Sequence, residues 1–185
     1  KNILILTFGF ISPRKGNKTL LEAFSQFLPQ YSKARLVFLG GGHPEQKNIY
    51  KDYLKQIRKL IKKLKIEKEV IIFNKFVPAS LVETYFKAAD VYVSTHPYKS
   101  QISSGPLTFA MGAGKVIVST DFDYAKDMLK NGRGILFPIG DSAALAKAIL
   151  KILSNPNLRK KLEKKGALFG KNLLWDKTAL RYIKV

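Results

Sequence analysis

The sequence has no cysteine, one tryptophan, two methionines and two histidines among its 185 residues. The absence of cysteine excludes disulfide bridges and thiolate metal sites. The two histidines are far apart, and the carboxylates show no tight grouping, so no metal-ligand cluster is indicated. A Walker loop and a G-x-S-x-G elbow are also missing. The residues by themselves therefore indicate no self-contained nucleophile, base or metal centre.

Long apolar runs and an N-terminal leader pattern are also lacking. No apolar run reaches the roughly 20 residues that a membrane-spanning helix needs. The segment 1–8 is too short and too strand-like for a signal peptide. Because residue 1 is Lys1 rather than methionine, we expect the chain to begin inside a longer protein.

Acidic residues are scarce, with 13 Asp and Glu against 33 Lys and Arg, for a formal net charge of +20. Such an excess is typical of proteins that bind nucleic acid, anionic lipid or a phosphorylated ligand. A general enrichment in Lys and Ile, as in thermophile proteins, explains the bulk of the charge equally simply, and we favour it. A phosphate site would need only two or three of these cations.

With 46% hydrophobic residues, the chain is typical of a globular protein, and we expect one domain over residues 1–185. A chain of this length buries about 70% of its unfolded surface, enough for a core without cross-links. The Lys-rich segment 51–68 invites a nucleic-acid or membrane interpretation. Its regular apolar stripe favours a helix that packs on the core and exposes a basic face.

Short apolar segments alternate with amphipathic ones along the whole chain. The predicted strands are 2–8, 35–39, 70–73, 91–93, 116–119 and 135–137. The predicted helices are 18–27, 49–64, 78–86, 106–112, 124–129, a helix capped by Asp141 that runs to 153, and 156–168. Buried strands between helices predict an α/β fold, with a single Rossmann-like, doubly wound parallel sheet of about six strands flanked by helices.

In such a sheet, ligands bind beyond the carboxyl ends of the strands, so the loops that follow strands matter most. The first such loop, 9–16, begins with Gly9 and carries Arg14 and Lys15 before Gly16. The glycines allow close approach to a ligand, and both cations can reach phosphate oxygens. An ordinary basic loop with a proline turn is the alternative.

The second loop holds the triplet Gly40-Gly41-Gly42, followed by His43. Consecutive glycine N–H groups can cradle an anion, and a flexible turn is the alternative. The spacing is not that of a dinucleotide fingerprint. We interpret His43 as a solvated polar residue rather than a catalytic one.

The third loop, 94–106, is long and polar and leads into a helix that starts at Pro106. Small, hydroxylated residues precede that helix, so the N–H groups near Ser103, Ser104 and Gly105 stay accessible to an anion. Simple capping of the helix by Ser104 is the alternative. A loop of this length favours ligand binding.

An ordered series of motifs resembles the C-terminal domain of the retaining glycosyltransferases of the GT-B fold, the large family four. The series comprises Gly9 with Lys15-Gly16, Leu39-Gly40-Gly41-Gly42, Ala88-Ala89-Asp90-Val91-Tyr92-Val93, Ala110-Met111 with Gly114 and Val116-Ile117-Val118, and Asn131-Gly132 with Gly134-Ile135-Leu136-Phe137-Pro138. The resemblance covers nearly the whole chain and implies one half of a two-domain fold.

This resemblance implies that the chain binds the nucleotide diphosphate-sugar donor. Lys15 matches the family lysine that contacts the diphosphate, whereas Phe10 stands where the family often has arginine; we expect Arg14 to compensate. The base is expected at the segment 74–77. The implied catalytic residues are Lys15 and Gln101. The implied donor-binding residues are Gly9, Arg14, Lys15, Gly41, Phe76, Val77, Gln101, Ser103, Ser104, Gly105 and Leu107.

The chain departs from the family at two positions where glutamates are usual. Gln101 replaces the one that contacts the donor sugar, and Phe109 replaces the one that binds the ribose hydroxyls. An amide can still bond a sugar hydroxyl, but a phenyl ring cannot bind ribose. Because the surrounding loop is coherent, we favour a subgroup with altered donor recognition.

The acceptor is expected on an N-terminal domain of the same protein, so this chain alone should bind nucleoside diphosphates weakly and transfer no sugar. We expect no metal or other cofactor, a cytoplasmic location with peripheral membrane contact kept open, and no specific nucleic-acid partner. Two other functions stay open: a non-catalytic nucleotide-sugar-binding module, and a basic nucleic-acid-binding domain. Base-stacking aromatics interleaved with cations, which would favour the last, are not evident.

Overall fold

A computed structural model describes residues 2–42, 45, 47–173 and 175–183. It contains one six-stranded sheet in the order β3-β2-β1-β4-β5-β6, in which every neighbouring pair is parallel. The strands are β1 (Ile3–Phe8), β2 (Ala34–Leu39), β3 (Val70–Phe73), β4 (Val91–Ser94), β5 (Val116–Thr120) and β6 (Ile135–Phe137). This is the strand order of a Rossmann-like domain.

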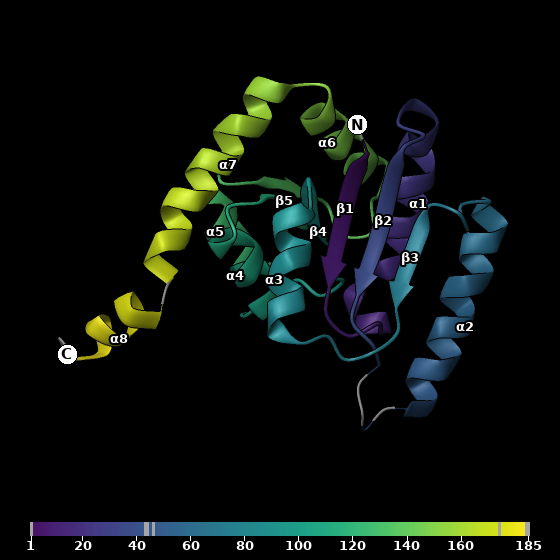
Figure 1. Ribbon diagram of the computed structural model, residues 1–185, viewed down its shortest axis with the longest axis horizontal. Coiled ribbons are helices and arrows are strands. Elements are labelled where there is room, and N and C mark those ends of the chain that lie inside the picture. The colour runs from purple at the N-terminus through teal and green to yellow at the C-terminus, as the bar shows by residue number, and fades with distance from the viewer. Residues whose placement is uncertain (1, 43–44, 46, 174, 184–185) are drawn as a thin grey trace.

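The helices are α1 (Asn17–Phe27), α2 (Lys47–Leu64), α3 (Ala79–Ala88), α4 (Gly105–Gly112), α5 (Asp123–Leu129), α6 (Ser142–Leu153), α7 (Pro156–Gly170) and α8 (Trp175–Ile183). Short 3-10 turns, η1 (Pro13–Lys15), η2 (Leu28–Gln30), η4 (Lys130–Gly132) and η5 (Lys171–Leu173), join some of them. Figure 1 shows the helices on both sides of the sheet, with α8 extending away from it beyond the end of α7.

Two hydrophobic cores lie on opposite faces of the sheet, because successive side chains of a buried strand point to opposite faces. Ile5 of β1 belongs to the core under α1, α2 and α6, and Leu6 to the core under α3, α4 and α5. The apolar stripe of α2, which includes Tyr53 and Ile57, is buried in the first core. This confirms α2 as a core-packed helix with a solvated basic face.

The predicted helices and strands are confirmed, and none of their ends is shifted by more than two residues. Asp141 caps α6 as expected, its Oδ1 accepting a 2.8 Å hydrogen bond from the N–H of Ala144. One helix start was wrong: Pro78 has ψ 149° and is the N-cap of α3, which begins at Ala79. The helix α8 was not predicted, because the polar residues after Phe169 interrupt the apolar spacing.

The direction of the chain reverses at β1, which lies between β2 and β4. After β1 the chain enters α1 on one face, and after β4 it enters α4 on the opposite face. The loops that follow β1 and β4 therefore diverge at the carboxyl edge and leave a crevice between them. Such a switch point is where open α/β sheets bind ligands.

At their amino ends, β1 and β4 are held together by Asp90. One carboxylate oxygen of Asp90 accepts a 2.8 Å hydrogen bond from the Leu4 N–H, and the other lies 2.9 Å from the Arg159 guanidinium on α7. Arg159 also bonds Glu163 at 2.9 Å. Asp90 thus ties β1, β4 and α7 together at the amino edge, far along the strands from the crevice.

Candidate functional site

The loops after β1 and β2 are joined at the carboxyl edge by backbone hydrogen bonds. The N–H of Gly9 donates to the Leu39 carbonyl at 3.0 Å, and that of Ile11 donates to the Gly41 carbonyl at 2.9 Å. Gly40 has φ +134° and packs so closely on Gly9 that a side chain there would overlap the Gly9 carbonyl. The glycines of the second loop therefore support the first loop.

A tight turn presents Arg14 and Lys15 at the crevice. The turn η1 carries both cations and ends at Gly16, whose φ of +59° is left-handed. The Thr95 hydroxyl donates a 2.7 Å hydrogen bond to the Lys15 carbonyl, and Gly16 packs against the Thr95 carbonyl, leaving no room for a side chain. The loop after β4 therefore holds the cationic turn in place.

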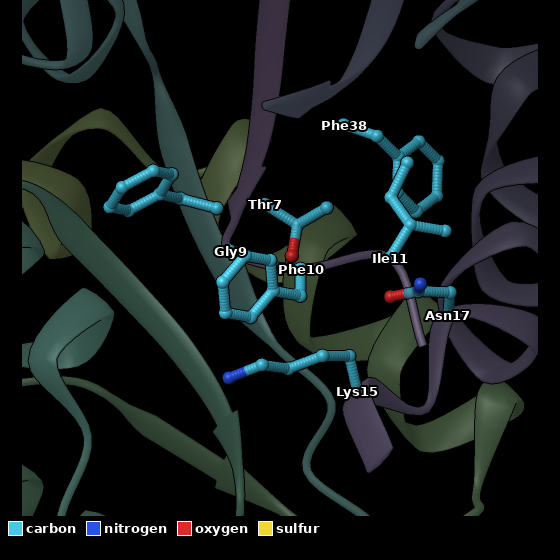
Figure 2. A pocket seen from close by; sticks show the side chains of 8 residues that line it. Thr7, Gly9, Phe10, Ile11, Lys15, Asn17 and Phe38 are labelled. Carbon is cyan, nitrogen blue, oxygen red and sulfur yellow. The ribbon is translucent and has the colours of Figure 1, made fainter. Parts of the chain in front are cut away.

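The Lys15 side chain runs back over the end of β1, extended beside the pocket that Figure 2 shows. A Cβ built on Gly9 would lie 3.7 Å from the Lys15 Nζ and 3.8 Å from Pro106 at the start of α4. Burial, and then the charge of Arg14, lower the pKa of Lys15. No acidic side chain pairs with Lys15 in the described part of the chain. The ammonium is thus a half-buried cation without a counter-ion.

Two hollows lie at the cationic turn, one lined by Lys15 and the other by Arg14. The narrower, of about 10 Å³, has room for about one water molecule and is lined by residues that include Phe10 and Asn17 (Figure 2). The wider, of about 370 Å³, is lined by Arg14, Tyr98, Ser100 and Gln101. The structure thus brings Arg14 and Gln101, which are 87 positions apart in the sequence, to one open hollow.

The Gln101 side chain shapes the third loop. Its Nε2 donates a 2.8 Å hydrogen bond to the Ser103 carbonyl. The main-chain carbonyl of Gln101 accepts a hydrogen bond from the N–H of Tyr124 at 3.2 Å, and the main-chain carbonyl of Lys99 accepts one from the N–H of Asp123 at 2.9 Å. The loop is therefore attached to the start of α5, and the Gln101 side-chain carbonyl oxygen stays available to a ligand.

Two interpretations were made for the start of α4: an anion site formed by free N–H groups, and capping of the helix by Ser104. The Ser104 hydroxyl accepts a 3.3 Å hydrogen bond from the Leu107 N–H, so Ser104 does cap the helix. The Leu107 side chain is fully buried, and Pro106 has no N–H. The N–H groups left without a partner among the described residues are those of Ser103, Ser104 and Gly105.

The predicted base segment presents one side chain outward and one inward. Phe76 is 87% exposed in the loop after β3, whereas Val77 is 7% exposed and belongs to the second core. Phe109 is also exposed and meets Phe8 edge to face, with ring centroids 6.3 Å apart. Aromatic surface therefore stands where the family usually has a carboxylate.

One residue of the site was not singled out from the sequence. His96 is only 5% exposed, and its ring packs on Phe122 with centroids 5.3 Å apart. Within the described part of the chain, its Nδ1 has no hydrogen-bond partner. Burial, followed by the charges of Lys15 and Arg14, lowers the pKa of His96 to about 4. In the sequence, the only indication that His96 belongs to the site was its place just after a buried strand, with Thr95 between them. The other histidine, His43, lies outside the described residues.

Fold and site together define a doubly wound α/β domain with a cationic crevice at its switch point. The chain belongs to the glycosyl transferases group 1 family, which it matches over residues 1–169. It is 30% identical to a phosphatidyl-myo-inositol mannosyltransferase from Mycobacterium leprae, covering all of this chain and 46% of that protein. It is 28% identical to an uncharacterised glycosyltransferase from Methanocaldococcus jannaschii, covering 45% of it. The chain therefore spans about half the length of these curated relatives.

Solved structures confirm the fold. Sucrose-phosphate synthase from Thermosynechococcus elongatus superposes with a TM-score of 0.85 at 24% identity, covering all of this chain and 44% of that one. The C-terminal domain of a glycosyl transferase group 1 family protein from Francisella tularensis gives 0.78 at 20% identity, over 89% and 82% of the two chains. HepE from Anabaena, in complex with UDP and glucose, gives 0.80 at 21% identity, over 92% and 44%. The chain therefore has the fold of one half of a GT-B glycosyltransferase.

Proposed function

We propose that this chain is the donor-binding half of a retaining glycosyltransferase, and that it holds the diphosphate of a nucleotide-sugar in the crevice between the loops after β1 and β4. The observation that carries the proposal is the Lys15 ammonium, which is half-buried beside Gly9 and has no acidic partner among the described residues. A buried cation without a counter-ion is costly, and an anionic ligand relieves that cost. The complex of the structurally similar HepE with UDP supports a nucleotide as that ligand.

Sugar transfer leaves negative charge on the departing diphosphate. Lys15 and Arg14 are placed to stabilise that charge as it develops, with the N–H groups of Ser103 and Gly105 as further donors. Gln101 lines the same hollow as Arg14, and its side-chain oxygen would accept a bond from a donor-sugar hydroxyl. Because cations perform the task that a metal ion would otherwise perform, we propose transfer without a metal or another cofactor.

The exposed ring of Phe76 offers a flat apolar face for the base, while the neighbouring Val77 is buried in the core. No carboxylate stands at position 109 to bind ribose. We therefore propose that stacking and diphosphate contacts, more than ribose hydrogen bonds, hold the nucleotide.

An acceptor site is expected on a partner domain within the same protein, because the chain spans under half of its curated relatives. The reaction would take place between the two halves, and this chain alone would bind a donor without transferring sugar. A cytoplasmic enzyme at a membrane surface fits the relative named for a phosphatidyl-myo-inositol substrate. In the described residues, no helix has both the length and the apolar character to cross a bilayer.

Titration calorimetry with UDP-glucose and GDP-mannose tests this proposal. Lys15→Ala should weaken binding about tenfold, because a charge-assisted hydrogen bond contributes about 1.5 kcal/mol or more. Lys151→Ala is the matched control, since Lys151 is exposed in the last turn of α6, at the opposite edge of the sheet. An unchanged dissociation constant for Lys15→Ala would remove Lys15 from the site.

Two further outcomes separate the remaining functions. Absence of heat with a full panel of nucleotide-sugars would favour a module that has lost donor binding. Measurable sugar transfer by this chain alone would show that the site is complete and would overturn the assignment to half an active site.

A further inference from the structure

The His96 imidazole lies directly behind the cationic turn. It follows β4 and Thr95, the residue whose hydroxyl bonds the Lys15 carbonyl. Its own carbonyl accepts a 2.8 Å hydrogen bond from the Thr120 hydroxyl, which attaches it to β5. Two aromatic rings lie near the imidazole, that of Phe122 with its centroid at 5.3 Å and that of Tyr98 with its centroid at 6.4 Å. The imidazole is therefore held in place by its aromatic neighbours and by the bond to β5.

This packing leaves one polar atom unsatisfied. The Nδ1 of His96 is buried and has no hydrogen-bond partner among the residues that the structure describes, although most buried polar side-chain atoms in native structures have one. A core position of this kind would be filled at lower cost by an apolar side chain. The orphaned nitrogen therefore points to a state of the site in which the protonation of His96 changes.

The charges that face His96 explain why it is neutral in the free chain. Lys15 and Arg14 of η1 both act on the ring, and both disfavour its protonated form. The start of α5 packs on the ring through the uncharged Phe122, and the acidic residue that follows, Asp123, pairs with Lys126 at 3.6 Å. The ring of Tyr98, whose centroid lies 6.4 Å from that of His96, carries the other polar group at this place. Burial adds to the effect of the two cations, and the pKa of His96 falls to about 4.

We propose that His96 is the proton-coupled residue of the donor site: when a diphosphate neutralises Lys15 and Arg14, the His96 imidazole takes up a proton. The inference rests on the proposed function, because the diphosphate is the ligand that reverses the local field. The proton comes from solvent and adds to a ring nitrogen of the neutral imidazole, so the bound complex gains one proton and one positive charge. This charge lies behind the cations, where it adds to their hold on the anion.

The sign of the pH dependence follows from linkage. A group whose pKa is higher in the complex than in the free chain makes binding tighter as the pH falls through the bound-state value. Above that value the affinity reaches a plateau, because His96 is then neutral in both states. Below about pH 4 the free chain is also protonated and the coupling ends.

The experiment uses UDP-glucose and GDP-mannose, because a diphosphate esterified at both ends has no group that titrates between about pH 5 and 8, unlike free UDP. The chain has two histidines, so their ring signals can be followed separately by NMR, with His43→Asn to assign them. With saturating donor, the His96 pKa should rise by about 1.5 units or more. Calorimetry in buffers of different ionisation enthalpy should show proton uptake near pH 5.5.

His96→Asn places an amide near the Nδ1 position and cannot take up a proton. This variant should still bind donor, with no proton uptake and with an affinity that does not change between about pH 5 and 7. Over the same rise in pH, the affinity of the parent chain for donor should fall at least threefold. The NMR titration of the parent chain stands even if this variant does not fold. Donor binding with an unmoved His96 pKa would overturn the inference and leave the proposed function intact. Failure of both donors to bind would overturn the proposed function, and this inference with it.

Discussion

The Thr95 hydroxyl donates a hydrogen bond to the carbonyl oxygen of Lys15, 80 positions earlier in the sequence, and this single 2.7 Å contact joins the two loops of the crevice. The backbone of Lys15 is thereby oriented by β4, while its side chain extends over the end of β1. Thr95 is a positioning residue: it acts on a ligand through Lys15.

Thr95→Val should separate that positioning from packing, because valine keeps the shape and loses the hydroxyl. We expect a loss of about 1 kcal/mol of stability from the unpaired carbonyl, and roughly fivefold weaker donor binding. Thr95→Ser should restore both values. Denaturant unfolding and calorimetry measure them, and unchanged binding by Thr95→Val would mean that Lys15 is oriented without this bond.

Gly16→Ala should be among the most disruptive small changes in the chain. The left-handed backbone disfavours any side chain, and a methyl group would overlap the Thr95 carbonyl. We expect a loss of about 2 kcal/mol or more in the free energy of unfolding, with weaker donor binding. Gly112→Ala is the contrasting control, because no atom of the described residues lies within 4 Å of a Cβ there. It should be neutral or stabilise by up to about 0.5 kcal/mol.

Restoring a carboxylate at position 101 should weaken the site rather than improve it. The Gln101 amide donates to the Ser103 carbonyl, which a carboxylate cannot do, and the new charge would face Arg14 and a bound diphosphate. Gln101→Glu should therefore raise the donor dissociation constant about fivefold or more. Gln56→Glu adds the same charge on the exposed side of α2 as a control. Tighter binding by Gln101→Glu would show that the loop still accommodates a glutamate.

Phe76 and Val77 should respond in opposite ways to truncation. Phe76→Ala removes an exposed ring, so stability should change by less than about 0.5 kcal/mol, while loss of base stacking should weaken donor binding about fivefold. Phe76→Tyr should keep the affinity. Val77→Ala should instead cost about 1 to 2 kcal/mol of stability, because Val77 packs in the core. Equal affinities for Phe76→Ala and the parent chain would place the base elsewhere.

Much of this architecture could be predicted from the sequence, because buried parallel strands are recognisable as short apolar runs. Parallel strands also bring the loops that follow them to one edge, which is why Arg14 and Gln101 could be assigned to one site before the structure was known. The resemblance to a family then assigned chemistry to these positions. Their roles stay predictions until donor binding is measured.

Other features depend on packing that no local pattern encodes. His96 belongs to no recognisable motif in the sequence, and only its contact with Phe122 and the two nearby cations makes it unusual. The inward and outward directions of Val77 and Phe76 follow from the path of a loop. The Gln101 bond to Ser103 depends on a side-chain rotamer, and α8 lies where apolar spacing is interrupted.

The strand β4 is fastened at both ends, by Asp90 to the Leu4 N–H and by Thr95 to the Lys15 carbonyl. The four residues between them, Val91–Ser94, therefore act as a spacer of fixed length. Because side chains alternate along a strand, one added or deleted residue would turn Thr95 to the opposite face whenever Asp90 kept its place. Substitutions that preserve burial should be tolerated in this segment. Any change in its length should instead break the link between the Asp90 contacts at one end of β4 and the ligand site at the other.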